Sequence, residues 1–290
     1  MNFDFLKPNT LEELVQIMKC GGEDVKILAG GTDLIPSIKA EKVHPKAIVS
    51  IAEIKELQKI TVDPVEGLTF GCGVTLHELE NNKSIQENYK ALYEGIHSMA
   101  STQIRNMGTV VGNICNAVPS ADTAPALIAL DGEIHIKSFK GERTVKAEEF
   151  FTGVCTTVLK PEEIVTDIHI PAPRGDAKSK YTKFTVRRAL ELAMAGVAVR
   201  TEEKDGTFSN VRIALGAVAP TPKLAENAME LLEGKPISRA LIEDAAVKAS
   251  EDDSSPISDK RASEEYRREI VRICTRDALI ETSGLMGGNR

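Results

Sequence analysis

The chain has 290 residues, 42% of them hydrophobic and 27% charged, and it carries a formal net charge of −7. That length is enough for two or three packed units, and an acidic balance without a long Lys/Arg run argues against nucleic acid and anionic membranes as partners. No stretch approaches the about 18 consecutive apolar residues of a membrane span, and the start lacks the pattern of a secretory signal.

The first predicted unit alternates helices and short strands. Thr10 and Glu13 form a capping-box pattern in front of a helix that a glycine pair ends. A buried strand is expected at 25–29, followed by a Gly-rich turn, and a second strand at 47–51. This order is typical of an α/β unit.

A second unit is predicted from about residue 60, where the pattern changes. Thr75 and Glu78 give another capping box, which indicates that a helical region interrupts the strands. The expected strands lie at 68–73, 133–137 and 164–170, and the expected helices at 84–99 and 121–130.

The rest of the chain changes to a two-residue period after a Pro-rich linker at 171–176. Asp205-Gly206 suits a hairpin turn between the last two strands of this part. Three antiparallel strands are expected at 181–187, 192–201 and 208–217, and three helices at 224–232, 239–250 and 261–282.

Basic side chains crowd the last predicted helix, and they are Lys260, Arg261, Arg267, Arg268, Arg272 and Arg276. Such a run usually forms a solvated face balanced by nearby glutamates. It can also form a docking face for an acidic partner subunit. Charge patterning leaves both interpretations open.

The cysteines and histidines show no spacing typical of a metal site. The five cysteines are scattered without a C-x-x-C pair, so neither an Fe–S cluster nor a zinc site is expected in this chain. Reduced thiols of a cytoplasmic protein are the simplest interpretation. The sequence has no H-E-x-x-H pattern and no G-x-S-x-G elbow, so no catalytic group is predicted.

The strongest local signal is the segment Lys26-Ile27-Leu28-Ala29-Gly30-Gly31-Thr32-Asp33-Leu34. Consecutive glycine amides can form a concave anion site because no Cβ blocks approach, and a helix that begins near Leu34 would add its positive end. The segment either cradles the pyrophosphate of a dinucleotide or is a tight turn that needs positive φ. It is neither a Rossmann fingerprint nor a P-loop.

A second polar and Gly-rich segment runs from Arg105 to Asp122. It is too polar for a core strand and too apolar for a surface linker, which favours a backbone that lies against a polar ligand. Asp122 could accept hydrogen bonds from ribose or ribityl hydroxyls. Alternatively, it is an early-turn helix carboxylate that the helix dipole stabilises, and spacing alone favours that simpler interpretation.

Taken together, these segments resemble the FAD-binding medium subunit of molybdenum hydroxylases, the group of xanthine, nicotinate and carbon monoxide dehydrogenases. The resemblance covers essentially the whole chain. Its motifs are A-G-G-T-D-L (29–34), Q-I-R-N-M-G-T-V-V-G-N-I (103–114), P-S-A-D (119–122), P-E-E-I (161–164), K-F-T-V-R-R (183–188) and A-V-A-P-T-P (217–222).

The resemblance implies an α+β fold of the vanillyl-alcohol-oxidase type. Two α/β subdomains, expected at 1–57 and 58–175, would sandwich FAD. A C-terminal domain at 178–290 would add a three-stranded antiparallel sheet and helices.

The resemblance also implies which residues contact FAD. The first group wraps the pyrophosphate: Lys26, Ile27, Leu28, Ala29, Gly30, Gly31, Thr32, Asp33 and Leu34. The second forms a phosphate and ribityl loop: Thr109, Val110, Val111, Gly112 and Asn113. The remaining contacts are Asp122, Ile164 and Lys183, with Ser101 in the stretch beside the flavin.

By resemblance, this chain is one subunit of a purine- or nicotinate-type dehydrogenase. A large subunit with the molybdopterin cofactor hydroxylates the substrate, and a small subunit with two [2Fe–2S] clusters passes electrons to FAD here. NAD(P)+ is the expected acceptor. FAD is expected to be non-covalent because neither Gly-rich motif contains a histidine, and no inserted four-Cys cluster is visible.

Two other functions stay open. The chain could be a free-standing flavin-dependent oxidase or reductase, although few residues of the C-terminal part look catalytic. It could also be a nucleotide-binding assembly module without enzymatic activity. The purified chain would be yellow as a flavoenzyme of either kind and colourless as a nucleotide-binding module.

Overall fold

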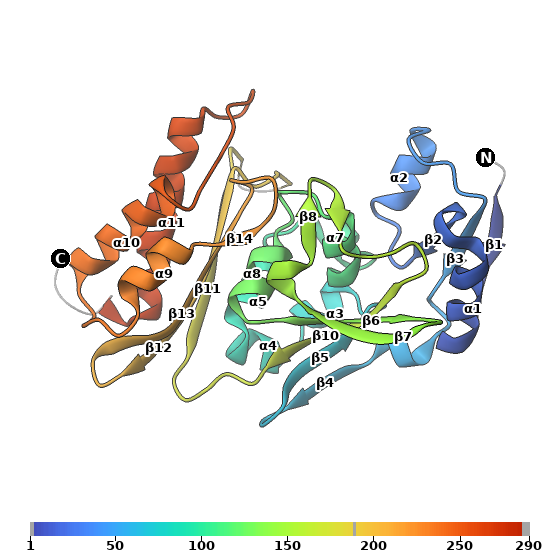
Figure 1. Ribbon diagram of the computed structural model, residues 1–290, viewed down its shortest axis with the longest axis horizontal. Helices are drawn as coiled ribbons and strands as arrows, with labels where there is room; N and C mark the ends of the chain where they lie inside the picture. The colour runs from blue at the N-terminus through green and yellow to red at the C-terminus, as the bar shows by residue number, and fades with distance from the viewer. Residues whose placement is uncertain (1–2, 188–189, 286–290) are drawn as a thin grey trace.

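A computed structural model describes residues 3–187 and 190–285 of the chain and contains three main sheets in a row (Figure 1). The N-terminal sheet lies at one end, the C-terminal sheet and its helices lie at the other, and a five-stranded sheet with its helices lies between them. The predicted mixed α and β class is confirmed. Arg188, at the end of the K-F-T-V-R-R motif, lies outside the described residues.

The N-terminal unit is a parallel sheet with the strand order β1-β3-β2. Its strands are β1 (Asp4–Leu6), β2 (Val25–Leu28) and β3 (Ala47–Ser50), and its helices are α1 (Leu11–Gly21) and α2 (Leu34–Lys39). Thr10 caps α1 by accepting from the Glu13 amide at 3.2 Å. The capping box is only half formed, because the Glu13 carboxylate accepts from the Asn9 amide instead.

The middle unit is an antiparallel sheet with the order β4-β5-β10-β6-β7. Alternate residues such as Phe70 and Ile168 are buried on one face against the helices, as the two-residue period requires. The strands are β4 (Ile60–Asp63), β5 (Gly67–Gly71), β6 (Glu133–Ser138), β7 (Gly141–Lys146) and β10 (Ile164–Pro171), with a small separate pair β8 (Phe151–Gly153) and β9 (Thr156–Thr157).

One prediction about the helices of the middle unit is wrong. The single helix expected over 84–99 is two helices, because Tyr89 leaves helical geometry (φ −125°, ψ 50°) and buries its ring, which is 2% exposed. The predicted Thr75–Glu78 capping box is complete. The helices are α3 (Leu76–Glu80), α4 (Lys83–Asn88), α5 (Lys90–His97), α6 (Thr102–Arg105), α7 (Val110–Asn116) and α8 (Thr123–Ala129).

The C-terminal sheet has four strands instead of the predicted three. The fourth has only two residues, too few for a two-residue period to reveal. The predicted hairpin turn is present, with Asp205 at φ 52° and Gly206 at φ 74°. The strands, in sheet order, are β11 (Lys178–Phe184), β12 (Ala195–Lys204), β13 (Thr207–Gly216) and β14 (Lys223–Leu224).

Helices cover both faces of the C-terminal sheet (Figure 1). On one face lie α9 (Glu226–Leu232), α10 (Arg239–Glu251) and α11 (Glu264–Thr282). The other face packs on α5 and α8 of the middle unit so closely that a Cβ on Gly216 would lie 2.5 Å from Pro125 Cγ. None of the helices within the described ranges is long and apolar enough to cross a membrane.

The basic side chains of α11 are largely balanced within the chain, which supports the first of their two interpretations. Arg267 is not on a solvated face at all: its side chain is 4% exposed and bonds Asp259 at 2.9 Å. The other pairs on this helix are Arg268–Glu264, Arg272–Glu269, Arg272–Glu243 and Arg276–Asp277.

Candidate functional site

The two Gly-rich segments meet through their backbones. A Cβ on Gly30 would lie 1.9 Å from the carbonyl oxygen of Met107 and 2.8 Å from Cα of Gly108. Only glycine permits this approach, since no side-chain movement could relieve a clash with backbone atoms. The structure therefore brings together two segments that the sequence separates widely.

The first segment continues β2 into the start of α2, as predicted. Gly31 has φ 70°, so it needs the left-handed region that favours glycine. Asp33 occupies the N-cap position of α2, but its carboxylate accepts no hydrogen bond from the first turn of the helix. Desolvation raises the pKa of this carboxyl. Thr32 lies toward the second segment, 3.5 Å from where a Cβ on Gly108 would stand.

The second segment is not the loop that was predicted over 109–113. Thr109 is the N-cap of α7 and its hydroxyl accepts from the Gly112 amide at 2.8 Å. The side chains of Val110 and Val111 are buried in the core, at 0% and 5% exposure. A ligand at this segment would therefore meet the backbone of these two residues and not their side chains.

The same segment is joined to the start of α8. Asn113 Oδ1 accepts from the Thr123 hydroxyl at 2.7 Å. The neighbouring Asp122 occupies the N-cap position of α8 but makes no cap hydrogen bond. Asp122 does lie at the helix start, as the simpler interpretation predicted, but its carboxylate makes its hydrogen bonds elsewhere.

Asp122 instead joins the middle unit to the C-terminal sheet. Its carboxylate accepts from Lys183 Nζ at 2.8 Å and from the Tyr181 hydroxyl at 3.0 Å, and all three side chains are buried. Burial raises the pKa of Asp122, and Lys183 and Tyr181 oppose that rise. Asp122 and Lys183, both predicted site residues, thus meet in space. Tyr181 was missed, although it stands two residues before Lys183 and so on the same strand face.

A strained turn at 98–101 lies beside this group. Ala100 has φ 47°, an unusual conformation for a residue with a Cβ. Lys183 Nζ donates to the Ser98 carbonyl at 3.2 Å. Ser101 caps α6, because its hydroxyl accepts from the Ile104 amide at 3.4 Å.

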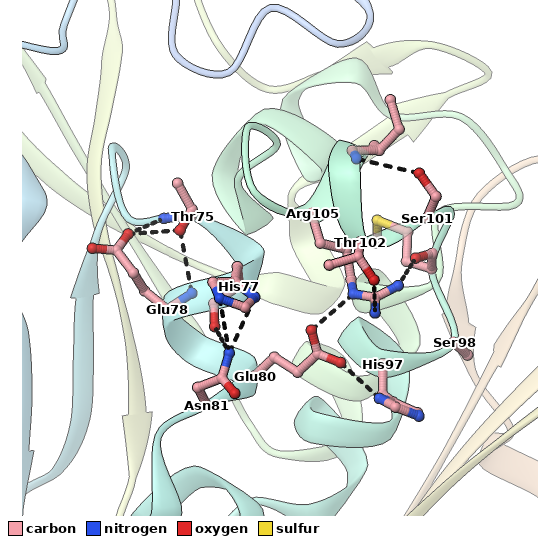
Figure 2. Close-up of polar contacts among 12 residues, drawn as sticks. Thr75, His77, Glu78, Glu80, Asn81, His97, Ser98, Ser101, Thr102 and Arg105 are labelled. Atoms are coloured by element: carbon pink, nitrogen blue, oxygen red, sulfur yellow. Dashed lines mark hydrogen bonds and ion pairs between the residues drawn. The ribbon is translucent and has the colours of Figure 1, made fainter.

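A second, largely buried ion pair joins Arg105 and Glu80 next to the same turn (Figure 2). Arg105 donates to Glu80 at 2.8 Å and to the Met99 carbonyl at 2.8 Å, and its side chain is 10% exposed. His97 contacts the other oxygen of Glu80 at 2.7 Å. Burial would raise the pKa of Glu80, but the hydrogen bonds from Arg105 and His97 outweigh it and leave the pKa below its ordinary value. No local pattern in the sequence pairs Arg105 with Glu80.

Two further features lie apart from these contacts. Ile164 opens β10, pairs with Lys137 and is 2% exposed, so its side chain belongs to the core. A cavity of about 740 Å³ lies over the open face of the five-stranded sheet, where His135 and Asp167 line it. None of the predicted site residues lines this cavity.

The residues fit a flavin dinucleotide. Two Gly-rich turns in backbone contact, each leading into a helix start, suit the phosphates. Ile104 and Met107 expose apolar side chains beside them, at 40% and 57%, as contact with an aromatic ring system would require. Within residues 3–187 and 190–285, no cluster of three His, Cys, Asp or Glu could hold a metal ion.

Comparisons with known proteins agree with this geometry. Residues 1–173 match the family described as the FAD binding domain in molybdopterin dehydrogenase, and residues 180–282 match the carbon monoxide dehydrogenase flavoprotein C-terminal domain. The glyceraldehyde dehydrogenase medium chain of Sulfolobus acidocaldarius is 32% identical over 97% of this chain and 98% of its own. The putative xanthine dehydrogenase FAD-binding subunit of Escherichia coli K12 is 31% identical, with 99% of each chain covered.

Solved structures are similar over nearly the whole chain. Carbon monoxide dehydrogenase from Hydrogenophaga pseudoflava superposes with a TM-score of 0.92 at 29% identity, with 98% of each chain covered. Quinoline 2-oxidoreductase from Pseudomonas putida 86 gives a TM-score of 0.90 at 26% identity, again with 98% of each chain covered.

Proposed function

Since the chain belongs to the FAD-binding medium subunits of the molybdopterin dehydrogenases, as its motifs predicted, we propose that it is the electron-relay subunit of a multi-subunit molybdenum hydroxylase. In this role it receives electrons from [2Fe–2S] clusters of a small partner subunit and delivers them to NAD(P)+ or another acceptor. The substrate is hydroxylated at the molybdopterin cofactor of a large partner subunit.

The observation that carries the proposal is the backbone contact between Gly30 and Met107–Gly108. It brings together the two motifs by which the family is recognised, each of which leads into the start of a helix. Bound FAD would supply the redox chemistry, and the protein supplies binding, orientation and electrostatics. The chain itself then needs no acid–base group, which agrees with the lack of a predicted catalytic residue.

We place the FAD contacts on the residues named from the motifs. The amides of Ala29 to Leu34 hold the pyrophosphate from one side, and the segment Thr109–Asn113 contacts it from the other. Within that second segment the Gly112 amide is already bonded to the Thr109 hydroxyl. Asp122 and Lys183 bind polar groups of FAD, Ser101 lies beside the ring, and Ile164 contributes its backbone because its side chain is buried. FAD is held without a covalent bond, between units at 1–57 and 58–175, with the domain at 178–290 closing the site.

The relatives' names support placing substrate choice on another subunit. Medium chains of this length belong to enzymes named for glyceraldehyde, nicotine and carbon monoxide, and all are 29–32% identical to this chain. One subunit fold thus serves chemically unrelated substrates. A purine- or nicotinate-type substrate stays a prediction for this chain.

The test is an affinity pull-down of the tagged chain from its native cells, with an absorption spectrum and metal analysis of the eluate. We expect flavin, iron and molybdenum together, with one larger and one smaller partner. Flavin on a lone polypeptide that an organic substrate can reduce would replace the proposal with a free-standing flavoenzyme. A colourless eluate that contains nucleotide would leave only a nucleotide-binding module.

A further inference from the structure

The turn Ser98–Ser101 is held in a conformation that its own sequence does not favour. Ala100 has φ 47°, where an L side chain crowds its own backbone, and glycine would be the relaxed choice. Such a residue keeps this conformation only when the surrounding structure imposes it. Hydrogen bonds from neighbouring side chains to the backbone of the turn impose this conformation.

Two buried cationic side chains donate hydrogen bonds to consecutive backbone carbonyls of this turn. Lys183 Nζ donates to the Ser98 carbonyl at 3.2 Å, and Arg105 Nη1 donates to the Met99 carbonyl at 2.8 Å. Hydrogen bonds from charged donors are stronger than neutral ones, and burial removes the competing water. The backbone just before Ala100 is therefore fixed at two successive peptide groups.

Each cation is itself held by a buried carboxylate. Asp122 bonds Lys183 at 2.8 Å, with side chains 7% and 8% exposed. Glu80 bonds Arg105 at 2.8 Å, with side chains 12% and 10% exposed (Figure 2). If Lys183 turned away, Asp122 would keep only the Tyr181 hydroxyl as a partner, and if Arg105 turned away, Glu80 would keep only His97. Loss of the cation from either largely buried carboxylate is costly.

The two cations come from different parts of the fold. Arg105 ends α6, whereas Lys183 lies on β11 of the C-terminal sheet. Glu94 of α5 fixes β11 in place, because its carboxylate accepts from the Tyr181 amide at 2.8 Å and from Lys180 at 3.0 Å. The turn is thus fixed from both sides of the boundary between the middle unit and the C-terminal sheet.

The turn also leads directly into the Gly-rich contact. Ser101 caps α6, and the Gly108 amide donates to the Ile104 carbonyl of α6 at 2.7 Å. Gly108 in turn touches Gly30. A shift of the turn would therefore move the backbone that meets the first Gly-rich segment.

We propose that Arg105 and Lys183 are positioning residues that lock the turn Ser98–Ser101 and, through α6, the second Gly-rich segment in the geometry that binds FAD. This inference rests on the proposed function. It deepens that function by assigning a role to the Glu80–Arg105 pair, of which Arg105 lies in the second motif and Glu80 in none.

The test measures FAD binding by the full-length chain. Arg105→Met, Glu80→Gln and Lys183→Met are compared with Arg212→Met as the matched control. Arg212 is also a mostly buried arginine that donates to a backbone carbonyl, that of Ile128 at 2.9 Å, and to a glutamate, but it does not touch the turn. The readouts are the FAD dissociation constant by fluorescence titration, the visible circular dichroism of bound flavin, and the thermal midpoint without FAD.

We expect Arg105→Met to weaken FAD binding at least tenfold and to change the visible circular dichroism, with a smaller effect of the same kind for Glu80→Gln. Arg105→Lys keeps a charged donor and should restore most of the binding. Arg212→Met should lower the thermal midpoint and leave both flavin readouts unchanged. Lys183→Met should weaken FAD binding as Arg105→Met does. Because Lys183 is also a proposed FAD contact, only the Arg105 and Glu80 variants can establish the positioning role.

Wild-type FAD affinity and circular dichroism in Arg105→Met would overturn the positioning role while leaving the proposed function intact. Equal losses of FAD in Arg212→Met would overturn it as well, because any buried arginine would then have the same effect. A wild-type chain that binds no FAD would remove the proposed function and this inference together.

Discussion

Substituting Gly30 with alanine tests the site most directly. The added Cβ would lie 1.9 Å from the Met107 carbonyl oxygen, so the two Gly-rich segments would have to separate by about 1.1 Å to reach the 3.0 Å that real Cβ contacts require. Both sides of this contact are backbone, so no side chain can rotate to relieve it. The substitution therefore changes the spacing of the two segments and not only their packing.

The expected loss follows from hydrogen-bond geometry. Amides placed about 2.9 Å from a phosphate oxygen no longer bond it after a shift of about 1 Å. A hydrogen bond to a charged group contributes about 1.5–3 kcal/mol, so the loss of two weakens FAD binding by about 3–6 kcal/mol, at least a hundredfold. Overpacking should also lower the free energy of unfolding by about 1–3 kcal/mol.

The assay is a fluorescence titration of FAD into the full-length variant, combined with urea unfolding without FAD. Gly71→Ala is the matched control, because its Cβ would lie 2.2 Å from the Leu57 carbonyl oxygen, a similar backbone clash between other segments. We expect Gly71→Ala to lose stability but to keep FAD. FAD bound by Gly30→Ala with wild-type affinity, or lost equally from both variants, would refute this account of the site.

Three more outcomes are expected. Gly31→Glu should abolish FAD retention, measured by absorbance after gel filtration, because bulk and negative charge would face the pyrophosphate; stoichiometric FAD would show that the first segment is misassigned. Lys183→Met should cost about 3–5 kcal/mol in urea unfolding by leaving Asp122 buried and unpaired, and adding Asp122→Asn should recover part of it; no recovery would contradict the pairing. The lowered pKa of Glu80 stabilises the folded state above its ordinary value of 4.5, and this advantage disappears as pH falls through the folded pKa. The difference in thermal midpoint between wild type and Glu80→Gln should therefore shrink below about pH 4.5, and a difference that is independent of pH would contradict the ion pair.

Local sequence signals predicted most of the elements, because their causes are local. Thr10 and Thr75 cap helices where the capping pattern places them, and Asp205-Gly206 forms the hairpin turn that its preference for positive φ indicates. Local signals failed where a contact with a distant part of the chain determines the local structure. Tyr89 breaks a helical pattern because its ring is buried in the core, and β14 exists only by pairing with β13.

The site divides in the same way. The motifs led us to place FAD on two segments that meet in the structure, but they misjudged the second segment, which looked like a loop because Gly112 and Asn113 occupy the first turns of a helix. The partners of Asp122 lie 59 and 61 residues away, and Glu80 lies 25 residues from Arg105. Ion pairs at such separations arise from the packing of whole units, and no periodicity within one segment can reveal them.

The junction of Asp122 with Lys183 also sets an order for biosynthesis. Ribosomes add about 5–20 residues per second and domains fold as they emerge, so the 61 residues between these partners delay the junction by about 3–12 seconds after Asp122 is made. During that interval the nascent chain has both Gly-rich segments but lacks the strand that completes the turn beside them. If the proposed role of Lys183 holds, we expect FAD to bind only after this residue has been made, and a nascent chain stalled before Lys183 to carry no flavin.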